Sequence, residues 1–147
     1  HTDPRSRGAI VGLSLNHTRG HVFRAVIEGI AFGSELILET MRANGYRPDE
    51  IVIAGGATQS ELWLQIHADV SNVPLTLTRV PDAPALGSAI LAAVAAGAYA
   101  TIEEAAGRMV AVERRIEPSK SGHDAYRDAY AAYKRAYRSL AEITHPA

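Results

Sequence analysis

The amino-acid sequence predicts an α/β protein in which helices cover both faces of a sheet. Short apolar runs alternate along the chain with longer segments of helical periodicity. The central run, residues 51–54, has four apolar residues and no polar face, which is typical of a strand covered on both sides. A Gly-Gly pair follows it directly, and helical spacing resumes a few residues later. These observations predict strand–turn–helix units.

The composition limits the possible classes of protein. The chain has 147 residues, of which 47% are apolar, and this is enough for one globular domain with its own core. Its net charge of -1 gives no electrostatic reason to expect binding to nucleic acid or to an anionic membrane. No apolar run approaches the roughly 18 residues of a membrane-spanning helix. There is no cysteine, so disulfides and thiolate chemistry are excluded, and a cytoplasmic location is compatible.

The chain opens with a short polar segment, residues 1–8, and then enters an apolar run at once. It has no initiator methionine and no signal peptide. We therefore expect a piece of a longer protein, although a processed chain would begin in the same way.

The first third of the chain predicts a strand and a long helix. Ala9 to Leu15 form an apolar run that we expect to be a strand. Apolar residues then recur at helical spacing from His21 to Ala43, and a glycine at position 45 suits a left-handed helix end. Gly29 and Gly33 lie one turn apart within this helix, and we expect close packing against a neighbouring element to explain them.

The middle of the chain predicts two further helices and one strand. Thr58 and Glu61 have the spacing of a capping box, which predicts a helix from Gln59 to Ser71. Leu75 to Val80 alternate between apolar and polar residues, as in a strand with one face more exposed to solvent than the other. Ala85 to Ala96 are apolar nearly all round, so we expect that helix to be buried on most sides.

The last third predicts two helices separated by a short strand. A capping-box spacing at Thr101 opens a helix that reaches Met109, and residues 110–116 form a weakly patterned strand. The final helix is expected from His123 to Ile143. Its four tyrosines fall on one face: Tyr126, Tyr130, Tyr133 and Tyr137. With basic neighbours they resemble a nucleic-acid surface, but the neutral net charge favours packing on the parent domain.

The candidate site lies between two turns that follow strands, residues 55–60 and 83–88, because ligands of α/β sheets bind outside the carboxyl ends of strands. Paired glycines permit positive φ and a close backbone approach, and free amides at a helix start favour phosphate. Gly55, Gly56 and Ala57 offer backbone contacts and Ser60 a hydroxyl. Alternatively, the Gly-Gly pair is only a tight turn. Neither a Walker A pattern nor a Gly-x-Gly-x-x-Gly fingerprint occurs.

Other candidate residues carry weaker signals. His17 and His21 have the spacing of a metal pair, but no third ligand lies nearby in the pattern, so we expect no metal site there. Asp69 is as well suited to pairing with a basic side chain or capping a loop as it is to contacting a ligand. Glu28 is expected to be paired or partly exposed, and His67 to lie on the flank of its helix.

Five segments resemble, in order and spacing, the C-terminal domain of the FGGY family of carbohydrate kinases. The resemblance extends from about residue 4 to residue 140, and each segment alone is a loose match. The segments are Arg-Gly-Ala-Ile-Val-Gly-Leu (7–13), Arg-Ala-Val-Ile-Glu-Gly-Ile-Ala-Phe (24–32), Gly-Gly-Ala-Thr-Gln-Ser (55–60), Ala-Asp-Val (68–70) and Ala-Leu-Gly-Ser-Ala (85–89).

The resemblance implies the C-terminal part of an actin-like ATPase (ribonuclease H-like) domain over residues 1–147, with a mixed sheet flanked by helices. It implies ATP in a cleft between two such domains, with Mg²⁺ on the phosphates. By the family pattern, Gly55, Gly56 and Ala57 line the nucleotide site, and Ser60 faces the adenosine. The amino-acid sequences of these segments are nearer to those of pentulose kinases than to that of glycerol kinase.

The resemblance also implies that the sugar contacts and the catalytic Asp belong to an N-terminal domain that this chain lacks. No catalytic or metal-binding residue is therefore assigned here, and the chain alone is expected to be inactive. Two alternatives stay open: a non-catalytic actin-like nucleotide-binding or assembly module, and an unrelated α/β enzyme with a structural Gly-Gly turn. Surfaces left uncovered by truncation predict dimerisation or aggregation.

Overall fold

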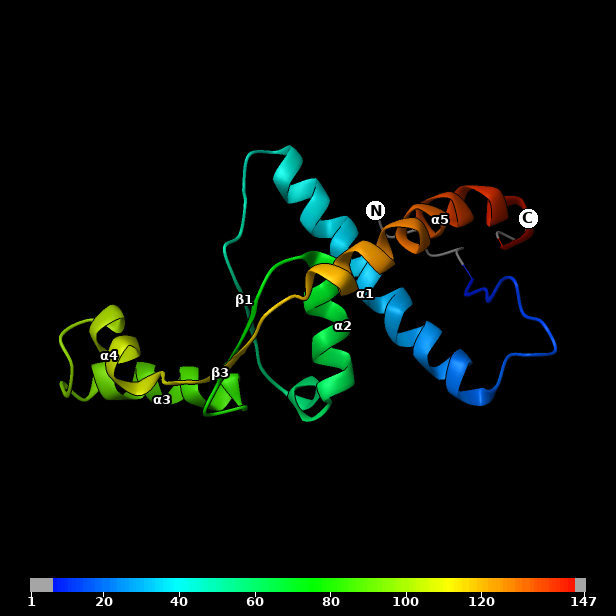
Figure 1. Ribbon diagram of the computed structural model, residues 1–147. Coiled ribbons are helices and arrows are strands. Elements are labelled where there is room, and N and C mark those ends of the chain that lie inside the picture. Colours follow the sequence, from blue (N-terminus) through cyan, green and yellow to red (C-terminus); the bar gives the residue numbers. More distant parts are fainter. Residues whose placement is uncertain (1–6, 145–147) are drawn as a thin grey trace.

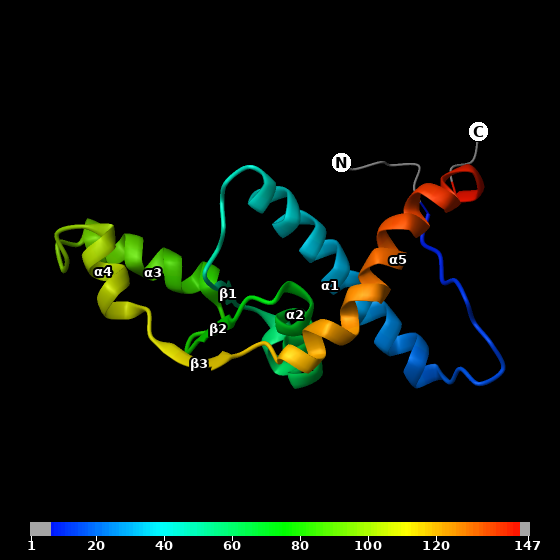
Figure 2. The same cartoon turned by 45° about the horizontal axis from the view of Figure 1, so that its top comes forward.

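The computed structural model describes residues 7–144 and confirms the α/β class. The elements follow in the order α1 (Arg19–Ala43), β1 (Ile51–Ile53), η1 (Gly56–Gln59), α2 (Glu61–Ser71), β2 (Leu75–Thr78), α3 (Ala83–Ala95), α4 (Ile102–Met109), β3 (Val112–Ile116) and α5 (Lys120–Thr144). Figure 1 shows α1, α2 and α5 gathered together, with α3 and α4 projecting at the opposite end of the strands. The turned view in Figure 2 shows the same separation. The polar opening segment lies largely outside the described residues.

The three strands form one mixed sheet, as expected, in the order β1-β2-β3. β1 and β2 are parallel, with Ile51 opposite Leu75 and Ile53 opposite Leu77, whereas β2 and β3 are antiparallel. Because β1 and β2 run in the same direction, their carboxyl ends lie at one edge of the sheet. In the part of the chain that the structure describes, β1 has a strand neighbour on one side only.

The core consists of two clusters that meet at α2. One lies between α2 and the sheet and contains Leu64, Ala68, Leu75 and Leu77. The other lies between α2 and α1 and contains Ile27, Ala31, Phe32, Ile66 and Val70. Trp63 packs against both clusters. Helix α2 therefore joins the sheet to the helical end of the molecule.

The tyrosine face of α5 packs against α1. The ring centroids of Tyr126, Tyr130 and Tyr133 lie 6.0, 5.8 and 5.5 Å from that of Phe32. A methyl group added at Gly33 would lie 3.5 Å from the Tyr133 hydroxyl, so this glycine has the close neighbour that its spacing predicted. The prediction is wrong for Gly29, because a methyl group there would have no neighbour within 4 Å among the described residues. These contacts favour the packing interpretation of the aromatic stripe over a nucleic-acid surface.

The predicted strand from Ala9 to Leu15 is wrong, because the structure gives this segment no strand. Strands need a partner that accepts and donates backbone hydrogen bonds, and the described chain supplies none here. The apolar side chains are accordingly exposed, and Leu15 is fully so. Gly12, where the pattern hinted at a bulge, has a φ of 84°.

Burial differs from expectation at two further elements. The prediction that one face of β2 is more exposed to solvent is wrong at Thr76. This residue is buried, and its hydroxyl donates a hydrogen bond to the Glu50 carboxylate. Helix α3 was expected to be covered on most sides, but Ile90 is its one buried residue among those described, and Leu91 is 57% exposed. Its main packing partner in the described chain is α4. None of the described helices is long and apolar enough to cross a membrane.

The junction of α2 and α5 was predicted less well than the elements themselves. Helix α5 begins at Lys120 rather than His123. Asp69 is buried, and its Oδ1 accepts hydrogen bonds from the Ser119 amide at 2.7 Å and from Gln65 at 2.8 Å. Asp69 therefore caps the loop that leads into α5, one of the two roles that the sequence left open. His67, which was expected on the flank of its helix, is buried.

Candidate functional site

Two turns meet at the carboxyl ends of the parallel strands. One follows β1 and begins with Gly55, and the other follows β2 and runs from Pro81 into α3. The amide of Gly55 donates a hydrogen bond to the Pro81 carbonyl oxygen at 2.9 Å, which ties the two turns together. The predicted juxtaposition of these turns is confirmed.

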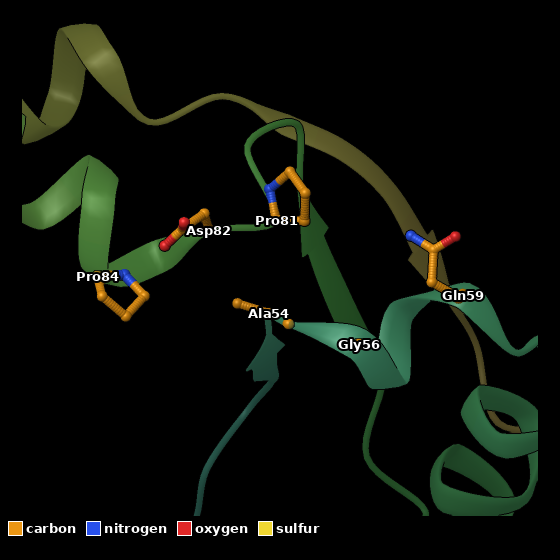
Figure 3. A pocket seen from close by; sticks show the side chains of 7 residues that line it. Ala54, Gly56, Gln59, Pro81, Asp82 and Pro84 are labelled. Atoms are coloured by element: carbon orange, nitrogen blue, oxygen red, sulfur yellow. The ribbon is translucent and has the colours of Figure 1, made fainter.

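The turns border a pocket of about 490 Å³. Its lining residues are Ala54, Gly55, Gly56, Gln59, Pro81, Asp82 and Pro84. Figure 3 shows Ala54 at the end of its strand, facing the Asp82 and Pro84 side, with Gln59 on the η1 side. Among the residues predicted for the site, Gly55 and Gly56 border this pocket, whereas Ala57 and Ser60 lie just beyond its lining.

The two glycines have different physical roles. Gly55 has φ 86° and ψ -165°, a backbone conformation that is essentially restricted to glycine. A methyl group added at Gly56 would have no other atom within 4 Å, and Gly56 is not among the positive-φ glycines. Gly55 is therefore required by the turn itself, whereas Gly56 leaves open space in the wall of the pocket.

The start of α2 differs from the predicted capping box. The Thr58 hydroxyl donates to the Gly55 carbonyl at 2.8 Å and closes the short η1 turn. The N-cap is Ser60, whose Oγ accepts a hydrogen bond from the Trp63 amide at 3.3 Å. The helix thus begins two residues later than predicted, because the earlier hydroxyl is satisfied within the turn.

Substitution of Ser60 tests its capping role at the start of α2. Ser60→Ala removes the cap of α2 and is expected to lower the free energy of unfolding by about 1 kcal/mol. Ser60→Asn retains a side-chain oxygen that caps well, so it should unfold close to the wild type. Chemical denaturation of both variants measures this. Equal destabilisation by both variants would contradict the capping role.

The sequence did not single out Gln59, Pro81 or Asp82 as site residues. Asp82 is the charged residue of the lining, and its Oδ1 accepts a hydrogen bond from the Ala85 amide at 3.0 Å, as the N-cap of α3. The signal was available in principle, because Asp82 follows β2 in the same way that the glycines follow β1. Its capping role and its position beside the pocket coincide.

The two histidines with metal-pair spacing each face a neighbouring hydroxyl group. Nδ1 of His17 lies 2.9 Å from the Ser14 hydroxyl, and Nδ1 of His21 lies 2.9 Å from the Thr18 hydroxyl. Within residues 7–144, no three metal-ligating side chains come together. Glu28 accepts a hydrogen bond from Arg24 at 2.7 Å, so it is paired as expected.

Comparison with known proteins identifies the family. A family model described as the FGGY family of carbohydrate kinases, C-terminal domain, matches residues 1–96, more than half of the chain. The xylulose kinase of Staphylococcus epidermidis is 35% identical over 144 residues, which are 98% of this chain and 29% of that protein. The ribulokinase of Mycolicibacterium smegmatis is 39% identical over 132 residues, 89% of this chain and 23% of that protein.

A solved structure agrees with these relatives. The crystal structure of xylulose kinase from Rhodospirillum rubrum matches with a TM-score of 0.83 and 30% sequence identity, over 98% of this chain and 29% of that chain. This match confirms the expected fold, the C-terminal part of an actin-like ATPase domain. The chain spans less than a third of the length of each of these relatives. It belongs to the FGGY family of carbohydrate kinases, whose C-terminal domain it matches.

Proposed function

We propose that this chain is the ATP-binding part of an ATP-dependent carbohydrate kinase. The observation that carries the proposal is the pocket between the Gly55 turn and the Pro81 turn, at the carboxyl ends of two parallel strands. Ligands of open α/β sheets bind at this edge. The pocket volume lies within the usual range for small-molecule sites, roughly 300–1,000 Å³.

The lining suits the nucleoside part of ATP. Ala54, Pro81 and Pro84 supply apolar contact for a base, and the Asp82 carboxylate accepts hydrogen bonds from sugar hydroxyls or amino groups. Gly56 leaves room for a close approach to the backbone. By the family resemblance, Ala57 and Ser60 would complete the site from the η1 side.

Mg²⁺ would neutralise charge on the transferring phosphates when bound. The described residues hold no group of three metal-ligating side chains. The chain's own contribution is to bind and orient ATP. Positioning of this kind is a large part of catalysis of phosphoryl transfer.

We also propose that residues 1–147 form a C-terminal domain that works with an N-terminal sugar-binding domain. An unpartnered apolar stripe on α1 supports this proposal. Five exposed side chains recur at helical spacing on the face turned away from the core: Phe23, Val26, Ile30, Ile37 and Met41. The exposed α3 and segment 9–15 add further uncovered apolar surface.

The uncovered apolar surface predicts self-association of the chain in isolation. Surfaces of this kind mark interfaces or aggregation sites, so the isolated chain should form dimers or larger species as its concentration rises. Sedimentation at several concentrations measures this. Ile30→Glu should shift the distribution toward monomer, whereas a concentration-independent monomer in the wild type would contradict the expectation.

A pentulose is the proposed acceptor, because relatives named xylulose kinase and ribulokinase match over most of this chain. The test uses a longer polypeptide that contains this chain together with the proposed N-terminal sugar-binding domain. Its release of ADP is measured with D-xylulose, L-ribulose or glycerol as acceptor. We expect turnover with a pentulose, and none with the 147-residue chain alone. Phosphorylation by the isolated chain, or none by the longer polypeptide with any acceptor, would contradict the proposal.

A further inference from the structure

His67 lies inside α2 and is held against Trp63. Its side chain is 7% exposed, and its ring stacks on the Trp63 ring with centroids 3.4 Å apart and planes at 22°. Nδ1 of His67 lies 2.9 Å from the Trp63 carbonyl oxygen. A carbonyl oxygen only accepts hydrogen bonds, so Nδ1 carries the proton. The contact therefore fixes one tautomer of the neutral imidazole.

The other ring nitrogen has no such contact. In the described part of the chain, Nε2 of His67 is buried and has no hydrogen-bond partner. Burial lowers the pKa of His67, and the hydrogen bond to Trp63 opposes that shift only in part. The stack therefore contains a ring that is neutral near pH 7 and has no acceptor for a second proton.

Trp63 connects this ring to the turn at the pocket. The Trp63 amide donates to Ser60 Oγ, and the Ser60 amide donates to the Ala57 carbonyl at 3.3 Å. Trp63 also packs against both core clusters, so its position affects both of them. Because the Trp63 backbone makes the contact to Ser60, a displacement of Trp63 that includes its backbone would be transmitted to Ser60 and to the end of η1.

We propose that His67 is a positioning residue for the nucleotide pocket: its neutral ring holds Trp63 and, through Trp63, the turn from Gly55 to Ser60. The inference rests on the proposed nucleotide-binding function of this turn. His67 is not one of the residues that line the pocket, so its effect would pass through Trp63.

Protonation of His67 should release the stack. A second ring N–H would need an acceptor, and Nε2 of His67 has no hydrogen-bond partner among the described residues where it lies. The charged groups on α2 and on the elements packed against it are mainly engaged with other residues: Glu35 with Arg42 on α1, Glu61 of α2 with Arg114 of β3, Asp69 of α2 with Ser119, and His123 of α5 with the Asp69 carbonyl. One acceptor is open among them, because Glu35 Oε2 is buried without a hydrogen-bond partner in the described chain. The protonated ring would therefore have to leave its position against Trp63 to reach water or this carboxylate.

Trp63 is the one tryptophan of the chain, so its fluorescence reports on the stack directly. Because the folded-state pKa of His67 is lowered, the stack should be intact above about pH 6.5 and be lost as the pH falls through that lowered pKa. We expect an emission change on acidification in the wild type. His67→Phe keeps a ring but cannot titrate, so it should abolish this change. The same titration in both proteins would overturn the coupling.

Kinetics of the longer polypeptide separate positioning from mere structural support. His67→Ala should raise the KM for ATP about fivefold at neutral pH and leave kcat within about twofold, and His67→Phe should restore most of the loss. Comparison of wild type and His67→Phe at each pH removes the effect of ATP ionisation, because both proteins use the same nucleotide. The wild-type KM should rise relatively more as the pH falls below about 6.5. A lower melting temperature of His67→Ala with unchanged KM, or equal pH profiles, would overturn the proposal. If the wild type shows no saturable ATP dependence, the nucleotide function itself fails.

Discussion

Gly122→Ala is expected to lower the free energy of unfolding by about 3 kcal/mol, because the added methyl group has no room. It would overlap the Asp69 carboxylate and lie 2.6 Å from the Ser119 Oγ. Neither neighbour can give way easily. Asp69 is buried and bound to the Ser119 amide and to Gln65, and the Ser119 hydroxyl accepts a hydrogen bond from the Gly122 amide at 3.0 Å.

The overlap can be relieved by two rearrangements, and both lower the free energy of unfolding. Either Asp69 moves and leaves buried hydrogen bonds unmade, or the start of α5 lifts away from α2. Gly29→Ala in α1 is the matched control, since a methyl group there has no neighbour within 4 Å. It should be neutral or stabilise the protein by up to about 1 kcal/mol.

Urea denaturation of both variants measures the difference. If Gly122→Ala proved as stable as Gly29→Ala, the loop between β3 and α5 would not be the rigid joint that its contacts indicate. If both variants were strongly destabilised, the local space around each glycine would not decide the outcome. The expected result is a large loss at position 122 alone.

Local sequence patterns predicted most elements of the fold, because they depend on short-range periodicity. The helical spacing of α1 and the capping residue Thr101 of α4 gave boundaries within a few residues of those observed. The glycine at position 45 ends α1 with a φ of 86°, as a left-handed helix end requires. Each of these signals lies within the element that it predicts or directly beside it, so no residue of another element was needed to interpret it.

Burial could not be predicted in the same way, because it depends on which element lies opposite. Apolar residues of α3 and of segment 9–15 gave the same pattern as buried ones, yet most of them are exposed or only partly buried in the described chain. Conversely, the polar residues Asp69 and Thr76 are buried because partners far along the chain satisfy them: the Ser119 amide and the Glu50 carboxylate. No local pattern contains these pairings.

The candidate site was predicted at the level of turns rather than of side chains. The Gly-Gly pair and its place after a strand located one wall, but the competition for hydrogen bonds within the turn decided which residue caps α2. Thr58 has the better capping-box spacing, and Ser60 is the cap. Such competition between neighbouring hydroxyls is a matter of three-dimensional geometry that the spacing alone does not fix.

Gly56→Leu is expected to raise the KM for ATP at least about tenfold in the longer polypeptide, since a side chain would fill the space that Gly56 leaves in the pocket wall. The fold should tolerate the change, because no atom lies within 4 Å of the added Cβ and the glycine is not in a positive-φ conformation. The melting temperature should therefore stay near that of the wild type. Initial-rate kinetics over a range of ATP concentrations measure the first effect, and thermal unfolding measures the second.

Gly55→Ala should show the opposite pattern. A methyl group at Gly55 meets no atom within 4 Å, but the φ of 86° and ψ of -165° strain any other residue by about 1–3 kcal/mol. This variant should lose stability, and its KM should change only as far as the turn distorts. If Gly56→Leu left the KM for ATP unchanged, the nucleotide would not approach this turn and the Gly-Gly pair would be structural. If KM rose for Gly56→Leu with stability retained, the open space at Gly56 would be the space that ATP occupies.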